Sequence, residues 1–195
     1  MSCELTTWWG AWAALLGGAL SIAQGALVLS NPDYYGFDSL ADDLVLVVEG
    51  VVLVLLSTGL AGLHAWQSGS YGRLGRAGFF AAFVGTVLAG AGHLFSAPFF
   101  DFVGTGGLVY VLFALVSAGI FLFGGMVYVV GVVSMSLGYL LLGVATARAR
   151  VLPVWCGAAL VFGIVGLWLG NGVGWVLFGL AWLVVGYTML RTKSG

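Results

Sequence analysis

Long apolar runs separated by short polar gaps form the main pattern of this chain. A helix needs about 20 apolar residues to cross roughly 30 Å of hydrocarbon, and several of the runs reach that length. The alternation of apolar and polar residues that is typical of a transmembrane β-strand is absent. Because backbone polar groups in lipid must be paired within the protein, the pattern predicts an all-α polytopic transmembrane helix bundle.

The runs predict seven spans in a single transmembrane domain that covers residues 1–195. Polar gaps such as SNPDYYGFDSLADD and SAPFFDFVGTGG separate the first runs, and Arg73 and Arg76 lie in another gap. The last apolar block is divided by Gly170-Asn171-Gly172, a sequence typical of turns. The predicted spans are about 7–29, 44–66, 77–95, 106–123, 126–147, 154–169 and 173–190.

The middle of the chain leaves two alternatives open. Leu108 to Ala147 is apolar for 40 residues, and one helix of that length would measure about 60 Å, twice the hydrocarbon thickness. Gly124-Gly125 is the natural break, which gives two spans and a total of seven. If this segment crossed once, all six basic residues would share one side, as the positive-inside rule favours. The alternative is therefore six spans plus a re-entrant or interfacial helix within 106–125.

The composition supports lipid as the solvent of this chain. Hydrophobic residues make up 62% and charged residues 7%, whereas a soluble domain carries about 25% charged residues. The net charge of −1 and the lack of a basic tail exclude a nucleic-acid partner. Cys3 and Cys156 have no metal-binding spacing. Glu4 and the lack of an early basic residue predict that the first apolar run is a retained span and not a signal peptide.

Small residues repeat every four positions in two of the predicted spans and across the last turn. Glycine alone accounts for 33 of 195 residues, more than twice the usual share of about 7%. Because the hydrophobic effect does not draw helices together in lipid, small residues that allow close approach mark the contact faces. We expect helix contacts at Gly17, Ser21, Gly25, Ala81, Gly85, Ala89, Gly166, Gly170 and Gly174.

Four polar side chains are candidates for a binding site. Glu49 is the only acid inside a predicted span, and an intramembrane carboxyl is by default a candidate proton or cation site. Gln24 is a second intramembrane polar group, and His93 continues the stripe of small residues on its helix, so it should face protein. Asn171 lies between two glycines. The alternatives are hydrogen bonds to neighbouring helices for Gln24 and Glu49, a bond to a backbone carbonyl or to the Asp101 loop for His93, and an ordinary turn for Asn171.

No metal site, catalytic set or cofactor is predicted. His64 and His93 end consecutive antiparallel helices on opposite sides, so they cannot both ligate one haem. No lysine lies within a span, which argues against a retinal Schiff base.

The sequence favours a non-catalytic protein that binds or transports a small or apolar molecule. A transporter would need a polar cavity near the midplane, lined by Glu49, Gln24 or His93. The alternative is an accessory or structural subunit, and a less favoured one is a membrane enzyme acting on lipid or quinone, which would need Glu49 and a histidine to converge. The expected partners are the lipid bilayer and either further copies of the chain or a larger membrane complex.

Two stretches resemble a known group of proteins. GLHAWQSGSYGRLGRAGFFAAFVGT (residues 62–86) and GYLLLGVATARARVLPVW (residues 138–155) are similar to small multi-span membrane proteins of bacteria and archaea of uncharacterised function. The resemblance covers about a quarter of the chain. It implies a multi-pass protein of a prokaryotic plasma membrane with nearer six spans, and it brings no activity, cofactor or catalytic residue.

Overall fold

The computed structural model describes residues 3–30, 40–96 and 108–193, and these residues form six α-helices without a strand. Five of the helices are long and apolar enough to cross a membrane, whereas the fifth in chain order has only 14 residues. The prediction of a helical bundle with several apolar helices of spanning length is confirmed. The helices are α1 (Cys3–Ser30), α2 (Leu40–Gln67), α3 (Gly72–Ser96), α4 (Leu108–Ala149), α5 (Val154–Leu167) and α6 (Asn171–Lys193).

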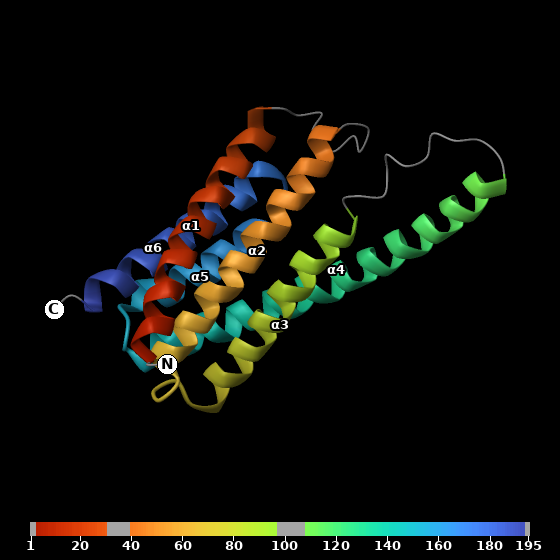
Figure 1. Cartoon of the computed structure of the whole chain (residues 1–195). Helices are drawn as coiled ribbons and strands as arrows, with labels where there is room; N and C mark the ends of the chain where they lie inside the picture. The colour runs from red at the N-terminus through yellow and green to blue at the C-terminus, as the bar shows by residue number, and fades with distance from the viewer. Residues whose placement is uncertain (1–2, 31–39, 97–107, 194–195) are drawn as a thin grey trace.

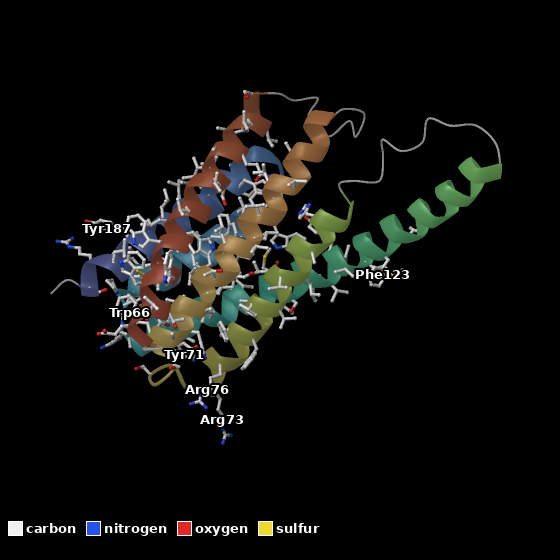
Figure 2. All side chains as sticks on the ribbon, viewed as in Figure 1. Trp66, Tyr71, Arg73, Arg76, Phe123 and Tyr187 are labelled. Carbon is white, nitrogen blue, oxygen red and sulfur yellow. The ribbon has the colours of Figure 1, made fainter. Side chains whose placement is uncertain are left out.

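The helices are arranged as a closed ring. Each helix packs against the next one in the chain, and α6 returns to pack against α1 (Figure 1). The start of α1, the turns at 68–71 and 150–153 and the end of α6 all lie at one end of the bundle. Figure 2 shows Arg73 and Arg76 at this end, which we call the arginine end because every arginine of the described residues lies there.

Large side chains fill the interior of the ring. Tyr139 of α4 meets Phe178 and Trp182 of α6 edge to face, with ring centroids 5.5 and 5.8 Å apart, and all three are fully buried. In α2, buried leucines recur every three or four residues, the spacing of one helix face. These leucines are Leu53, Leu56, Leu60 and Leu63. Exposed leucine and valine side chains cover the outer faces of the helices, as a hydrocarbon solvent allows.

Small residues let neighbouring helices touch backbone to backbone. Gly17 lies against α2, while Ser21 and Gly25 lie against α6. Ala81, Gly85 and Ala89 of α3 lie along α4, and Gly166 and Gly174 lie where α5 meets α6. Gly170 differs from the expectation, because nothing approaches its Cβ position within 4 Å and its φ is 71°. It ends the α5–α6 turn in a left-handed conformation that glycine adopts without strain, and it makes no helix contact.

The predicted break at Gly124-Gly125 is wrong, because α4 runs through it as one helix of 42 residues, about 63 Å long. The re-entrant or interfacial alternative within 106–125 is not seen either, since residues 108–125 belong to the same helix. Two glycines cost a helix about 2 kcal/mol in water. Summed over the 42 residues of α4, helix propensity and packing outweigh this local cost. The first part of α4 projects beyond the other helices (Figure 1).

Candidate functional site

Three of the four predicted polar residues converge from three helices. Gln24 Nε2 of α1 donates a hydrogen bond of 2.5 Å to Glu49 Oε1 of α2. His93 Nδ1 of α3 lies 3.1 Å from the other carboxyl oxygen, Glu49 Oε2. All three side chains are buried, with exposed fractions of 2%, 3% and 8% for Gln24, Glu49 and His93. We call this cluster the polar triad.

Helix packing explains why these side chains meet. Gly90 of α3 faces α2, since a Cβ there would lie 3.1 Å from Leu53 Cβ and 3.4 Å from the Gly50 carbonyl oxygen. His93 follows Gly90 by three residues, so it lies on the same face of α3. Glu49 precedes Leu53 by one helical turn and points into the same seam. Together these positions direct the imidazole at the carboxyl.

The polar triad lies near one end of the bundle. Glu49 is nine residues from the start of α2 at Leu40, and His93 is three residues from the end of α3 at Ser96. At 1.5 Å per residue, Gln24 is about 9 Å from the end of its helix at Ser30. This end is opposite the arginine end. All three side chains lie within about 14 Å of the ends of their helices.

Two buried polar atoms of the polar triad have no hydrogen-bond partner within the part of the chain that the structure describes, namely Gln24 Oε1 and His93 Nε2. An unpaired buried polar group costs about 1–3 kcal/mol. The cluster therefore retains an acceptor and a ring nitrogen that can bind something further.

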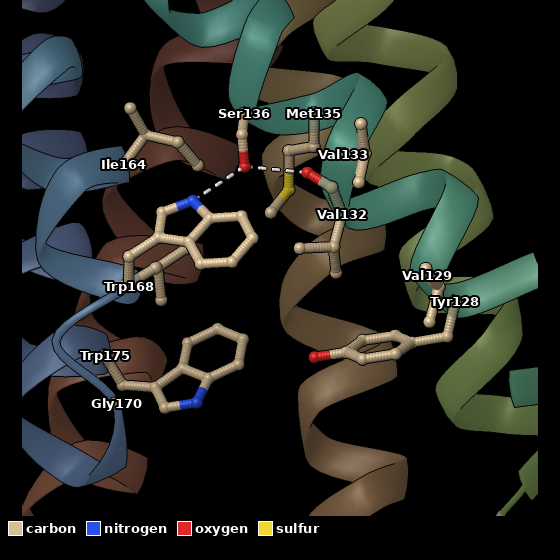
Figure 3. A pocket seen from close by; sticks show the side chains of 11 residues that line it. Tyr128, Val129, Val132, Val133, Met135, Ser136, Ile164, Trp168, Gly170 and Trp175 are labelled. Carbon is tan, nitrogen blue, oxygen red and sulfur yellow. Dashed lines mark hydrogen bonds between the residues drawn. The ribbon is translucent and has the colours of Figure 1, made fainter.

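A cavity of about 480 Å³ lies between α4, α5 and the start of α6. Figure 3 shows its lining, which is mostly apolar and aromatic. Trp168 Nε1 donates a hydrogen bond of 3.0 Å to Ser136 Oγ, which in turn donates one of 2.7 Å to the Val132 carbonyl oxygen. We call this cavity the indole pocket. Its lining residues are Tyr128, Val129, Val132, Val133, Met135, Ser136, Ile164, Leu167, Trp168, Gly170 and Trp175.

Tyr128 lies between the polar triad and the indole pocket. Its ring meets the His93 ring edge to face, with centroids 4.5 Å apart. Its phenol group points into the pocket (Figure 3). Gly92 brings α3 close at this point, because a Cβ there would lie 2.9 Å from the Tyr128 backbone nitrogen. The two sites are thus separated by one aromatic ring.

The role of Asn171 and the residues of the indole pocket are harder to predict from the sequence. Asn171 begins α6, and its side chain lies outside the described residues. A tryptophan near the end of a span, such as Trp175, is equally typical of the aromatic belt at a membrane interface. Nothing in the sequence pairs Tyr128 with His93. One feature of the sequence does indicate the pocket. Trp168 and Trp175 lie on either side of the turn, so they must lie at the same end of their helices.

Another buried polar contact was also missed. Thr146 Oγ1 of α4 donates a hydrogen bond of 3.0 Å to Gln67 Oε1 at the end of α2, between helices that are not consecutive in the chain.

Comparison of the chain with protein-family models, with curated proteins and with solved structures finds no match. Within residues 3–30, 40–96 and 108–193, no group of three or more His, Cys, Asp or Glu side chains is placed to hold a metal ion. The polar triad and the indole pocket are therefore the two candidate functional sites.

Proposed function

We propose that the protein is a multi-pass protein of a prokaryotic plasma membrane that binds a small apolar molecule in the indole pocket. The observation that carries this proposal is the cavity itself. Its volume of about 480 Å³ falls in the range of about 300–1,000 Å³ that is typical of small-molecule sites. Its apolar lining, with few polar groups such as the Ser136 hydroxyl, is also typical of such sites.

The exposure of the lining supports entry from the bilayer. At the mouth, Val129 and Trp168 are 59% and 64% exposed, and they lie on outer faces that meet hydrocarbon in a membrane. At the floor, Met135 and Ile164 are buried. A molecule dissolved in the bilayer can therefore reach the floor without crossing water. Trp168 and Trp175 offer flat surfaces against which a ring or a chain can pack.

The proposal is tested by asking what the protein retains on purification. The wild type is extracted from its membrane in mild detergent, and bound small molecules are released with organic solvent and identified by mass spectrometry. Val132→Trp fills the pocket and should remove the molecule. Val144→Trp is the matched control, because Val144 lies on the same helix, is exposed, and does not line the pocket.

We expect a molecule that the wild type and the Val144→Trp variant retain and the Val132→Trp variant lacks. Equal retention by all three proteins would show that the cavity is not the binding site.

A specific observation also favours the alternative of an accessory subunit. In the projecting part of α4, Leu122, Phe123 and Met126 are all largely exposed, and nothing lies within 4 Å of the Cβ positions of Gly119 and Gly125. An accessory subunit would contact its partner through such a surface. Light scattering of the detergent-solubilised protein tests this, because a complex that dissociates on Phe123→Ser would support the alternative.

The structure also meets one geometric requirement of a membrane enzyme, since Glu49 and His93 converge. However, neither residue lines the indole pocket, and the Tyr128 ring stands between them and it. A molecule bound in the pocket would therefore not touch the pair. For this reason we prefer a non-catalytic binding function.

A further inference from the structure

We infer that the polar triad is a proton-binding site, in which Glu49 and His93 share one proton taken up from the adjacent aqueous phase. This site is separate from the indole pocket and does not depend on what the pocket binds. It gives the chain a second function that neither the apolar cavity nor the helix packing provides.

The charge of the polar triad favours uptake of one proton. With an ionised Glu49 and a neutral His93 the polar triad carries a charge of −1 in an apolar environment, which is costly without a compensating cation. The arginines of the described residues lie at the other end of the bundle. Uptake of one proton makes the cluster neutral, whereas a second proton would make it positive and equally costly. The arrangement therefore favours binding of one proton.

The groups that face the polar triad do not change the number of protons that it binds. From α1 the group that faces Glu49 is the neutral amide of Gln24, and from α3 it is His93. From α4, Tyr128 packs behind the His93 ring. The side chains of Asp42 and Asp43, which precede Glu49 on α2, lie outside the described residues.

The geometry provides a route for the proton. Among the described residues His93 Nε2 has no hydrogen-bond partner, while Nδ1 is 3.1 Å from Glu49 Oε2. A proton bound at Nε2 makes the imidazole cationic, and the proton on Nδ1 can then pass to the Glu49 carboxylate. The imidazole is again neutral, the carboxyl is protonated, and the total charge has changed from −1 to 0. The three side chains lie within about 14 Å of the ends of their helices, opposite the arginine end, so we place the source of the proton on that side.

A metal cation fits the same atoms poorly. Hard cations such as Na⁺ and Ca²⁺ prefer several oxygen ligands. Gln24 directs its N–H group at Glu49, so its oxygen is turned away from the carboxyl, and His93 presents nitrogen. Only the carboxyl offers oxygens at the centre of the cluster.

The test counts protons in the full-length protein in lipid nanodiscs. The pH is lowered from alkaline to acidic, proton uptake is measured with an indicator dye, and the carboxyl carbonyl band is followed by infrared difference spectroscopy. We expect the wild type to bind one proton per chain more than Glu49→Gln. Ser57→Ala is the matched control, because Ser57 is buried on α2 and bonds only its own helix, through the Leu53 carbonyl oxygen. It should behave as the wild type.

Two further variants keep the test decisive. His93→Gln removes the second proton-binding group, so the whole proton stays on the carboxyl and the infrared band should be at least as strong as in the wild type. Val132→Trp should leave the proton count unchanged even where it abolishes retention of an apolar molecule, which separates this inference from the proposed function. If Glu49→Gln does not fold, absence of the carboxyl band in folded His93→Gln overturns the inference.

Two results in the folded proteins would also overturn it. One is an equal proton count for the wild type and Glu49→Gln. The other is a wild-type titration curve that moves when choline chloride is replaced by sodium chloride, because that would place Na⁺ in the site.

Discussion

Replacing Gly85 by alanine perturbs the contact between α3 and α4 at one of its closest points. A Cβ at this position would lie 2.1 Å from the backbone nitrogen of Met135 and 2.6 Å from its Cα. Real Cβ contacts are rarely shorter than 3.4 Å, and a backbone atom cannot rotate out of the way. The two helices would therefore have to move apart by about 1 Å, enough to lose up to about half of the dispersion attraction between the facing atoms.

The expected loss follows from the size of this displacement. Overpacking of a well-packed contact costs about 1–3 kcal/mol, and we expect Gly85→Ala to lower the free energy of unfolding by that amount. The better helix propensity of alanine offsets at most about 1 kcal/mol. Gly125→Ala on α4 is the control that measures this offset alone, because nothing lies within 4 Å of its Cβ position.

The assay is a titration of the detergent-solubilised protein with sodium dodecyl sulfate, followed by far-ultraviolet circular dichroism. Gly85→Ala should unfold at a lower fraction of the denaturing detergent than the wild type, and Gly125→Ala at an equal or higher fraction. If the two variants are equally stable, backbone contact between α3 and α4 does not hold the bundle together and the reasoning is refuted.

Three further predictions concern single hydrogen bonds and one tyrosine. Thr146→Val removes the bond to Gln67 and should lower the free energy of unfolding by about 0.6–1.7 kcal/mol in the same detergent titration. Ser136→Ala removes the acceptor of the Trp168 indole and should weaken retention of the apolar molecule about 3-fold to 10-fold, measured by mass spectrometry; unchanged retention would exclude this bond from the site. Burial raises the pKa of Tyr71, in the α2–α3 turn, from 10.0 to about 12, so its contribution to stability is complete below pH 10.0 and is lost as the pH rises to about 12. Tyr71→Phe should remove this part of the alkaline destabilisation, and an unaltered pH profile would contradict it.

The features that the sequence predicted correctly are those set by local composition. The limits of α1, α2 and α3 follow the apolar runs to within a few residues, because the charged gaps cannot enter hydrocarbon. The turn before α6 follows from Gly170, which adopts the left-handed conformation that the pattern indicates. A hydrogen bond between Glu49 and a neighbouring helix was one of the alternatives left open, and Gln24 provides it, whereas the pairing of Glu49 with His93 was not predicted.

What the sequence did not predict depends on tertiary geometry. The continuity of α4 through Gly124 depends on the helix as a whole, which outweighs the poor helix propensity of two adjacent glycines. The indole pocket depends on how α4 packs against α5 and α6. The spacing of apolar residues along the sequence does not predict that packing. The link from His93 to Tyr128 joins helices whose register is set by close contacts such as Gly92 on the Tyr128 backbone.

The distance between neighbouring helices varies around the ring, and this variation determines where the ring can deform. At five of its six seams a glycine Cβ would come within 3 Å of a backbone atom of the next helix, as Gly10 does at Gly62 and Gly25 at Gly172. Gly90, between α2 and α3, meets its nearest neighbour, a side-chain atom, at 3.1 Å. This wider spacing leaves α2 and α3 more room to shift before their backbones meet. Breathing of the ring therefore costs least between α2 and α3, and it stretches or shortens the nitrogen–oxygen distance between His93 and Glu49.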